Sequence, residues 1–410
     1  MGCVHRHVKF VFRAEGLIGA LLVRRGCRPG GALLVRMGCV RRHVKVGCRA
    51  MSRPWAADPF LKDCMHEFIE KQNSITKIIQ YKPTFKDMYS QNRTTCFEDV
   101  AVSSRIKDLA YAPHRYHSES KALLRLVLTW DAALTTAAQV PLVRGATSPE
   151  GASMIQTISK CTAEMALQLG MLADMALECS QLVQQCDVDE PDEAELMDNV
   201  DDFKAVLYRL FVQGMCTSIP GLTSVVMNAL QRPRTFIIAG RPQTFGSTEP
   251  VDGEIVTRCL KRMASAVVLS GHVLLAEFPE WDLLASFRIF DVGVCRRKGT
   301  KDNTNPEIVK QCARRLCSAL HLNEVDFLDE YHHFLPRAAK TKADCPQFTN
   351  FEAWREAILR TQKHGKQQRA AHPAENIKAA VLRLGCWSSS SSTVERSFEE
   401  TTGLHSPRLH

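Results

Sequence analysis

The chain has 410 residues, 45% hydrophobic and 24% charged, a globular composition that excludes a collagen-like or a mainly disordered protein. Its net charge of +9 is concentrated at one end, because residues 1–50 carry eleven Lys or Arg and one acidic residue, Glu15. Bulk charge therefore predicts no nucleic-acid surface on residues 51–410. Uninterrupted apolar runs are far shorter than about 20 residues, so we expect no membrane-spanning segment and no membrane partner.

The 16 cysteines are scattered and never occur as Cys-x-x-Cys. This spacing argues against a zinc ribbon, and we expect reduced thiols rather than disulfides. The chain also lacks the GxxxxGK[ST], GxGxxG, HExxH and GxSxG motifs. No cofactor, no metal site and no small-molecule substrate are predicted from the residues alone.

Residues 1–54 are predicted to form a basic, low-complexity tail. The segment 1–9 recurs at 37–45, and the segment 19–27 recurs at 31–39. A repeat that mixes Gly and Arg so densely cannot bury a face, so we expect disorder. Three interpretations stay open: a tail that binds nucleic acid or an anionic surface, a mitochondrial presequence, and a non-functional translated repeat before a start at Met51.

The body of the chain shows mainly helical periodicity, with breaks rich in Pro, Gly or acidic residues. We expect strands at Thr235–Ala239 and Ser286–Val292 only. Breaks are expected at 141–149, 187–202, 233–250, 296–306 and 336–347. Helices are predicted within the segments 55–80, 119–140, 151–186, 203–230, 254–278, 306–334 and 350–364.

Two polar segments suggest sites that the residues do not complete. Asp187–Asp202 holds nine acidic residues in sixteen positions but lacks the Gly of a calcium loop, so we predict a solvated linker. Glu330-Tyr-His-His333 is a Glu-x-x-His step of the kind found in di-iron helix bundles. No second such step is evident, and we predict an exposed helix end.

Near the C-terminus, a Ser-rich run at 388–392 leads into Val394-Glu395-Arg396-Ser397-Phe398. This segment resembles the C-terminal dimerisation region of hAT-family transposases, in which Ser-Glu-Arg-x-Phe follows small residues; here Val394 replaces the Ser. Pro113–Ser118 is similar to the family's Arg-Trp-x-Ser segment, with Tyr116 in place of Trp. Trp281–Asp291 resembles the strand-forming segment that follows the family's helical insertion.

The resemblance implies an RNase H-like sheet interrupted by a large helical insertion, with two Mg²⁺ ions held by two Asp and one Glu. Glu395 matches the Glu by position. The two Asp are not identifiable, since Asp87, Asp99 and Asp108 lie in no recognisable motif, and the family's zinc finger is missing. We therefore expect a fragmentary relative without catalysis and without a resident cofactor, with Mg²⁺ required only if it is catalytic.

The predicted fold is mainly α with a small sheet, a remnant of an RNase H-like α/β fold with a large helical insertion. Three domains are predicted. These are the tail at 1–54, a helical core and insertion at 55–345, and a truncated dimerisation region at 346–410.

The resemblance also implies a homodimer. Ile377, Val381 and Leu384 form a helical stripe that either contacts the second copy or packs in the core of its own chain. Glu395 has the alternative role of closing an S-x-x-E capping box with Ser392. The expected dimerisation residues are Ile377, Val381, Leu384, Trp387, Arg396 and Phe398.

The function predicted is dimerisation, with DNA as a further partner and the nucleus as the location by resemblance; the cytoplasm is the alternative. Arg115 is the candidate nucleic-acid residue, against the ordinary interpretation of a surface Arg. Two alternatives remain: an active Mg-dependent transposase or nuclease, and the unselected product of a decayed element.

Overall fold

Several helices begin where the sequence supplies a capping side chain. The computed structural model describes residues 57–96, 109, 118–186, 192–238, 240–277, 280–293, 305–368 and 373–386. Asp58 accepts hydrogen bonds from the N–H groups of Phe60 (2.8 Å) and Leu61 (3.0 Å) at the start of α2. Ser148 accepts one from Gly151 (2.9 Å) at the start of α8. Such caps contribute about 1 kcal/mol each.

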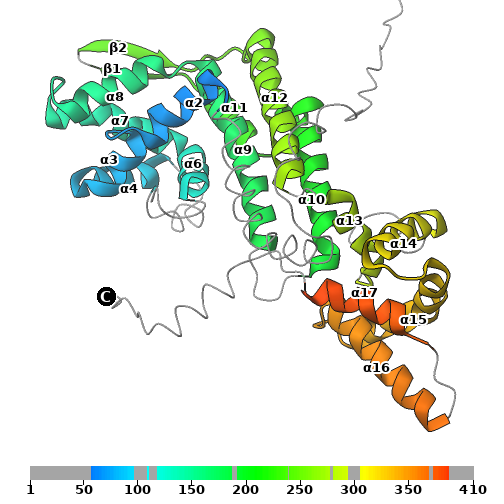
Figure 1. Cartoon of the computed structure of the whole chain (residues 1–410). Helices are drawn as coiled ribbons and strands as arrows, with labels where there is room; N and C mark the ends of the chain where they lie inside the picture. The colour runs from blue at the N-terminus through cyan, green and yellow to red at the C-terminus, as the bar shows by residue number, and fades with distance from the viewer. Residues whose placement is uncertain are drawn as a thin grey trace, which may run out of the picture. The chain divides into compact units, whose positions relative to one another are not determined.

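The described part of the chain is mainly helical (Figure 1). As far as residue 277 its elements are α2 (Pro59–Met65), the π-helical turn η2 (His66–Glu70), α3 (Ile75–Tyr81), α4 (Pro83–Cys96), α6 (Ser118–Leu128), α7 (Trp130–Arg144), α8 (Pro149–Lys160), α9 (Ala163–Cys186), α10 (Glu193–Leu207), the π-helical turn η3 (Tyr208–Val212), the 3₁₀ turn η4 (Met215–Thr217), α11 (Leu222–Leu230), β1 (Arg234–Ile238), β2 (Arg241–Phe245) and α12 (Gly253–Glu277). Beyond it lie α13 (Trp281–Ser286), the 3₁₀ turn η5 (Phe287–Phe290), α14 (Pro306–Leu320), α15 (Glu324–Asp344), α16 (Asn350–Gln368) and α17 (Glu375–Cys386).

The one sheet among the described residues is an antiparallel hairpin of β1 and β2. Arg234 lies opposite Phe245, and Ile238 lies opposite Arg241. Gly240, in the turn, has φ of 78°, a left-handed conformation that glycine adopts without a steric penalty. The strand predicted at Thr235–Ala239 is confirmed from Thr235 to Ile238 by β1, and Ala239 lies outside the described residues.

The strand predicted at Ser286–Val292 is wrong. α13 ends at Ser286 and η5 follows it, so this part of the segment that resembled a transposase strand is helical here. Phe287, Ile289 and Phe290 are all buried. A short apolar run that is buried on several sides has no period to separate strand from helix.

The predicted segment 119–140 forms two helices, α6 and α7, which meet at a 92° bend. Thr129 lies at the bend and is fully buried. Its hydroxyl donates to the carbonyl of Arg125 (2.7 Å) and accepts from the hydroxyl of Tyr89 (2.8 Å). A threonine that bonds the preceding turn in this way is a recognised cause of helix bending.

Three predicted breaks are helical in part. α7 continues through Pro141 to Arg144, inside the break predicted at 141–149. α10 covers Glu193–Leu207, so the acidic segment is not a solvated linker from Glu193 onward; residues 187–191 lie outside the described part. α15 continues through Pro336, because Phe334 and Ala338 on either side are buried in a common core. Tertiary packing thus overrides the helix-breaking tendency of the proline.

The buried side chains form two hydrophobic clusters. The first gathers residues of α2–α12 together with Leu109 and with Leu284 and Ala285 of α13, and in it Trp130 stacks on Phe68 at 5.6 Å between ring centroids. The second gathers η5, α14, α15, α16 and α17, with Ala194 of α10. At its centre the ring of Phe290 meets that of Trp354 edge-on at 5.2 Å. The predicted domain boundary at 345/346 falls between α15 and α16, which pack together.

α12 is long enough and apolar enough to cross a membrane, judged by length and composition; the bent pair α6–α7 passes the same test if taken as one span. The prediction that no segment could do so rested on uninterrupted apolar runs. α12 packs against α9 and η3 on one side, and 28% of its most apolar 18-residue window is buried. Length and composition alone therefore assign no membrane role to it.

Candidate functional site

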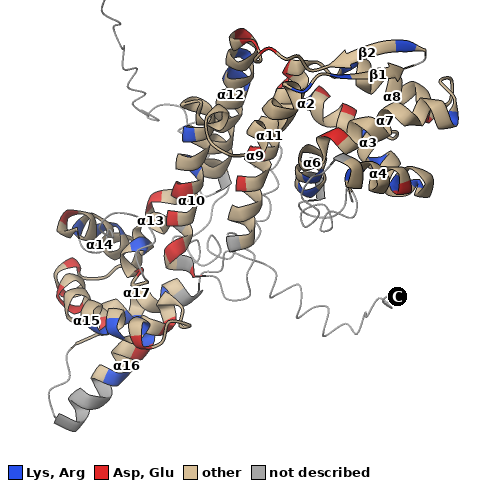
Figure 2. Ribbon diagram, turned by 180° about the vertical axis from the view of Figure 1, so that it is seen from behind, with Lys and Arg blue, Asp and Glu red and all other residues tan. Residues whose placement is uncertain are grey.

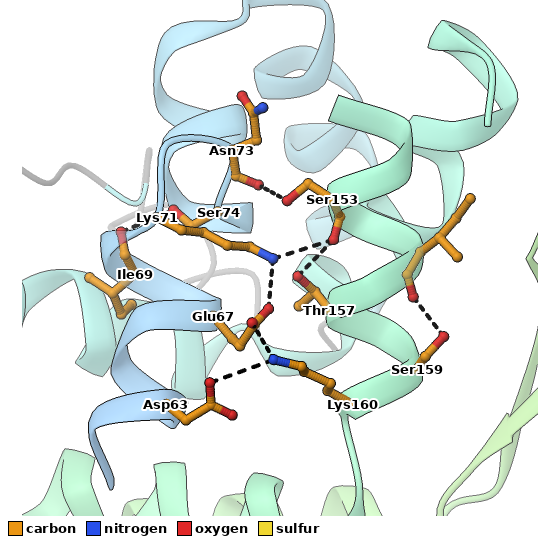
Figure 3. A network of polar contacts seen from close by, with 11 residues as sticks. Asp63, Glu67, Ile69, Lys71, Asn73, Ser74, Ser153, Thr157, Ser159 and Lys160 are labelled. Atoms are coloured by element: carbon orange, nitrogen blue, oxygen red, sulfur yellow. Dashed lines mark hydrogen bonds and ion pairs between the residues drawn. The ribbon is translucent and has the colours of Figure 1, made fainter. Parts of the chain in front are cut away.

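The buried carboxylate of Glu67, in the π-helical turn η2, lies between two lysines (Figure 3). Glu67 is only 3% exposed. Its oxygens accept hydrogen bonds from Nζ of Lys71 (2.6 Å) and of Lys160 (2.7 Å), and Lys160 also lies 3.5 Å from Asp63. η2 and the end of α8 are thereby joined by charge-assisted bonds.

The two lysines decide the ionisation of Glu67. Burial by itself would raise the pKa of this carboxyl, but the hydrogen bonds from Lys160 and Lys71 outweigh it and hold the pKa below its usual value. The hydrogen bond to Glu67 in turn raises the pKa of Lys160. A carboxylate that is neutralised in this way is a poor general base, since its charge is already committed.

A second buried carboxylate, Asp174 of α9, caps another helix. Its oxygens accept from the N–H of Leu222 (2.7 Å), and from the N–H (3.0 Å) and hydroxyl (2.6 Å) of Thr223. These groups lie in the first turn of α11, where backbone N–H groups lack partners within the helix. Asp174 therefore fixes α11 on α9.

Glu330 of α15 performs the same task for α17. It is 3% exposed and accepts from the N–H of Ile377 (2.8 Å) and from Nδ2 of Asn376 (3.0 Å). The prediction of an exposed helix end at Glu330–His333 is therefore wrong. Among the described residues, no group of three or more His, Cys, Asp or Glu side chains is placed to hold a metal ion.

Asn350, fully buried at the start of α16, joins three segments. Its backbone N–H (2.8 Å) and its side-chain Nδ2 (3.0 Å) both donate to Asp192. The same Nδ2 also donates to Asp291 (3.1 Å), and the side-chain Oδ1 accepts from the N–H of Val292 (2.7 Å). Burial raises the pKa of Asp192, although the bonds from Asn350 act in the opposite direction. The Asn350 amide therefore supplies hydrogen-bond partners to Asp192, Asp291 and the Val292 N–H, which would otherwise be desolvated without partners.

The described thiols are free and mostly buried. Burial raises the pKa of Cys216 and Cys259 to about 12 and that of Cys317 to about 11. A thiol with a raised pKa is a poor nucleophile and metal ligand at neutral pH. These cysteines behave as small core residues.

The sequence-predicted site residues fall into two groups. Ile377, Val381 and Leu384 lie together on α17, each at most 2% exposed, packed in the second cluster. Their burial within the chain matches the core interpretation, and a dimer contact through them stays a prediction. Of the candidate aspartates, Asp87 is exposed on α4. The predicted residues Arg115, Trp387, Glu395, Arg396 and Phe398, together with Asp99 and Asp108, lie outside the described residues.

The sequence did not predict the roles of Glu67, Asp174 and Glu330, the linking carboxylates that join helices. Glu67 and Lys71 carry a visible signal, because an acid four residues before a lysine on a helix is a favourable pair. Asp174 carries a weaker one, as an isolated acid among the apolar residues of α9. Lys160, 93 residues from Glu67, has no local signal.

Comparison with protein-family models, with curated proteins and with solved structures found no match for this chain.

Proposed function

We propose that this chain is a transposon-derived, hAT-like protein that acts by associating with a second copy of itself and with nucleic acid, without catalysing a reaction. In this proposal the helical body is the remnant of an RNase H-like fold with a large helical insertion. The likeness of Val394–Phe398 to the transposase signature supports it. The nucleus is the location that goes with this ancestry.

One observation carries the non-catalytic part of the proposal. The buried carboxylates Glu67, Asp174 and Glu330 are all engaged in joining helices through hydrogen bonds within the chain. Two-metal phosphodiester chemistry needs carboxylates that converge on an open site and retain lone pairs for the ions. Asp174 and Glu330 cap helices and Glu67 pairs with two lysines, so these carboxylates serve the fold, which favours a binding protein over an enzyme.

The proposal is tested on the full chain by two measurements. Light scattering coupled to size exclusion, over a concentration series, should give the mass of a dimer, and Phe398→Asp should dissociate it if the predicted C-terminal residues form the contact. Incubation with supercoiled DNA and Mg²⁺ should leave the DNA uncut. Cleavage that disappears in Glu395→Gln would contradict the proposal and support an active nuclease.

Nucleic-acid binding is measured by fluorescence anisotropy with duplex DNA. Because the basic excess lies in residues 1–50, a chain lacking residues 1–54 should bind DNA more weakly and with a smaller dependence on salt. Arg115→Ala, in the full chain, tests the single predicted contact in the body. Equal affinity of the full and shortened chains would remove the tail from the proposal.

A further inference from the structure

α12 carries an apolar stripe on the side opposite its core face. The buried face includes Cys259, Met263 and Leu274. On the other side Val268 is 52% exposed and Leu275 is 47% exposed. The partly exposed Ala264 and Gly271 complete the stripe at helical spacing: Ala264, Val268, Gly271 and Leu275.

Packing among the described residues does not explain Gly271. A Cβ at this position would meet no atom within 4 Å, whereas one at Gly170 of α9 would lie 3.1 Å from Cα of Thr223 in α11. Close packing of two helices therefore accounts for Gly170 but not for Gly271. A glycine within a helix destabilises it by about 0.5–1 kcal/mol relative to alanine. The open space beside Gly271 allows a close approach from outside the chain.

The stripe is complementary to itself when two copies run antiparallel. If Val268 of one copy faces Gly271 of the other, Leu275 faces Ala264 in the same alignment. Each large side chain then lies over a small one, and the two-fold symmetry makes every contact twice. A parallel pair would set Val268 against Val268 and Gly271 against Gly271, so that the large side chains collide and one gap remains between the glycines.

The charges along α12 favour the same direction. Glu254 lies in the first turn of α12, Arg258, Lys261 and Arg262 follow it, and the segment 263–276 carries no Lys, Arg, Asp or Glu (Figure 2). Arg258 and Arg262 pair with Glu164 of α9, so Lys261 is the cation of this group that the argument uses. Acidic residues follow at Glu277 and Glu280. In the antiparallel alignment the exposed Lys261 of one copy lies within one helical turn of Glu277, the last residue of α12, in the second. A parallel pair would place like charges together.

We infer that α12 is a self-association surface, on which a second copy of this chain binds in an antiparallel register with Val268 over Gly271. This inference rests on the proposed function, of which it names the surface and the partner. The turn η3, which packs on α12, exposes Tyr208 and Val212.

The test is a cycle of three variants in the full chain. Gly271→Val should weaken the dimer at least about tenfold, because two valines then meet where one fitted. Val268→Ala should weaken it through lost contact. The double variant Val268→Ala/Gly271→Val exchanges the large and small positions and should restore the dissociation constant to within about threefold of the wild type.

Two controls separate association from folding. Valine is a better helix former than glycine, so Gly271→Val should keep the thermal midpoint of the wild type or raise it. Val325→Ala, at a site on α15 that is 75% exposed, should leave the dimer unchanged. Light scattering gives the mass, and analytical ultracentrifugation gives the dissociation constant.

Each outcome decides one point. A dimer that none of the α12 variants affects overturns the inference and leaves the proposed self-association in place. A monomeric wild-type chain overturns both. A double variant as weak as Gly271→Val refutes the antiparallel register. A chain that is monomeric in solution but binds phosphatidylcholine–phosphatidylserine vesicles through Val268 refutes the second copy in favour of a membrane surface.

Discussion

Glu330 should decide whether α17 stays docked on α15. Replacing it with alanine removes the acceptor of the buried Ile377 N–H (2.8 Å) and of Asn376 Nδ2 (3.0 Å). A buried donor left without an acceptor costs about 1–3 kcal/mol, and the loss of a helix cap costs about 1 kcal/mol. Glu330→Ala should therefore favour opening of α17 by about 3 kcal/mol, which is more than a hundredfold in the opening equilibrium.

Hydrogen exchange followed by mass spectrometry measures this opening directly. Amides within 377–384 should exchange faster in Glu330→Ala, while those of α9 and α11, in the first hydrophobic cluster, should exchange as in the wild type. Glu330→Gln keeps an acceptor oxygen and should lose only about 1 kcal/mol. Asp326→Asn removes an exposed charge four residues earlier on α15 and is the matched control.

Exchange of α17 at the same rate in Glu330→Ala as in the wild type would refute a role of Glu330 in docking this helix. The contacts of Ile377, Val381 and Leu384 would then hold the helix without help from the carboxylate. Faster hydrogen exchange throughout the chain would also contradict local docking by Glu330, because Glu330 would then determine global rather than local stability.

Three further perturbations follow from the packing. Gly170→Ala should lower the free energy of unfolding by about 1–3 kcal/mol, because its Cβ would crowd α11. Gly271→Ala should raise the free energy of unfolding by about 0.5–1 kcal/mol, because the added Cβ meets open space and alanine favours the helix. Urea unfolding at low protein concentration measures both changes. Because the pKa of Glu67 is lowered on folding, its ionised form stabilises the protein above the unfolded pKa of about 4.3, and this contribution is lost as the pH falls through the lower, folded value. The urea midpoint of Glu67→Gln should thus lie below that of the wild type at pH 7 and approach it at acidic pH, and a constant difference would contradict the argument. Iodoacetamide should modify the half-buried Cys345 before the buried Cys64, whose pKa burial raises, as peptide mass spectrometry would show.

Local periodicity predicted where helices lie but not where they join. The segment 254–278 is α12 within one residue at each end, because a long amphipathic pattern has one solution. The bend at Thr129 depends on Tyr89, 40 residues away, which no local pattern contains. β2 was not predicted, since Arg241–Phe245 includes Pro242 and becomes a strand only by pairing with β1.

For the linking carboxylates too, the sequence indicated a residue but not its partner. The Glu-x-x-His step drew attention to Glu330, but its sequence neighbours suggested a metal or solvent as its partner. The actual partner is the first turn of α17, 47 residues later. Long-range partners are fixed by the packing of helices, and a single sequence does not specify that packing.

Asn350 also constrains the order in which the chain matures on the ribosome. Asp192 is synthesised 158 residues before the amide that bonds it. At translation rates of about 5–20 residues per second, this interval lasts roughly 8–30 s. Throughout it the acidic start of α10 stays hydrated, and its burial waits for α16. The N-terminal helical cluster thus has time to form on its own, and the arrival of Asn350 marks the moment at which the later helices close over Asp192.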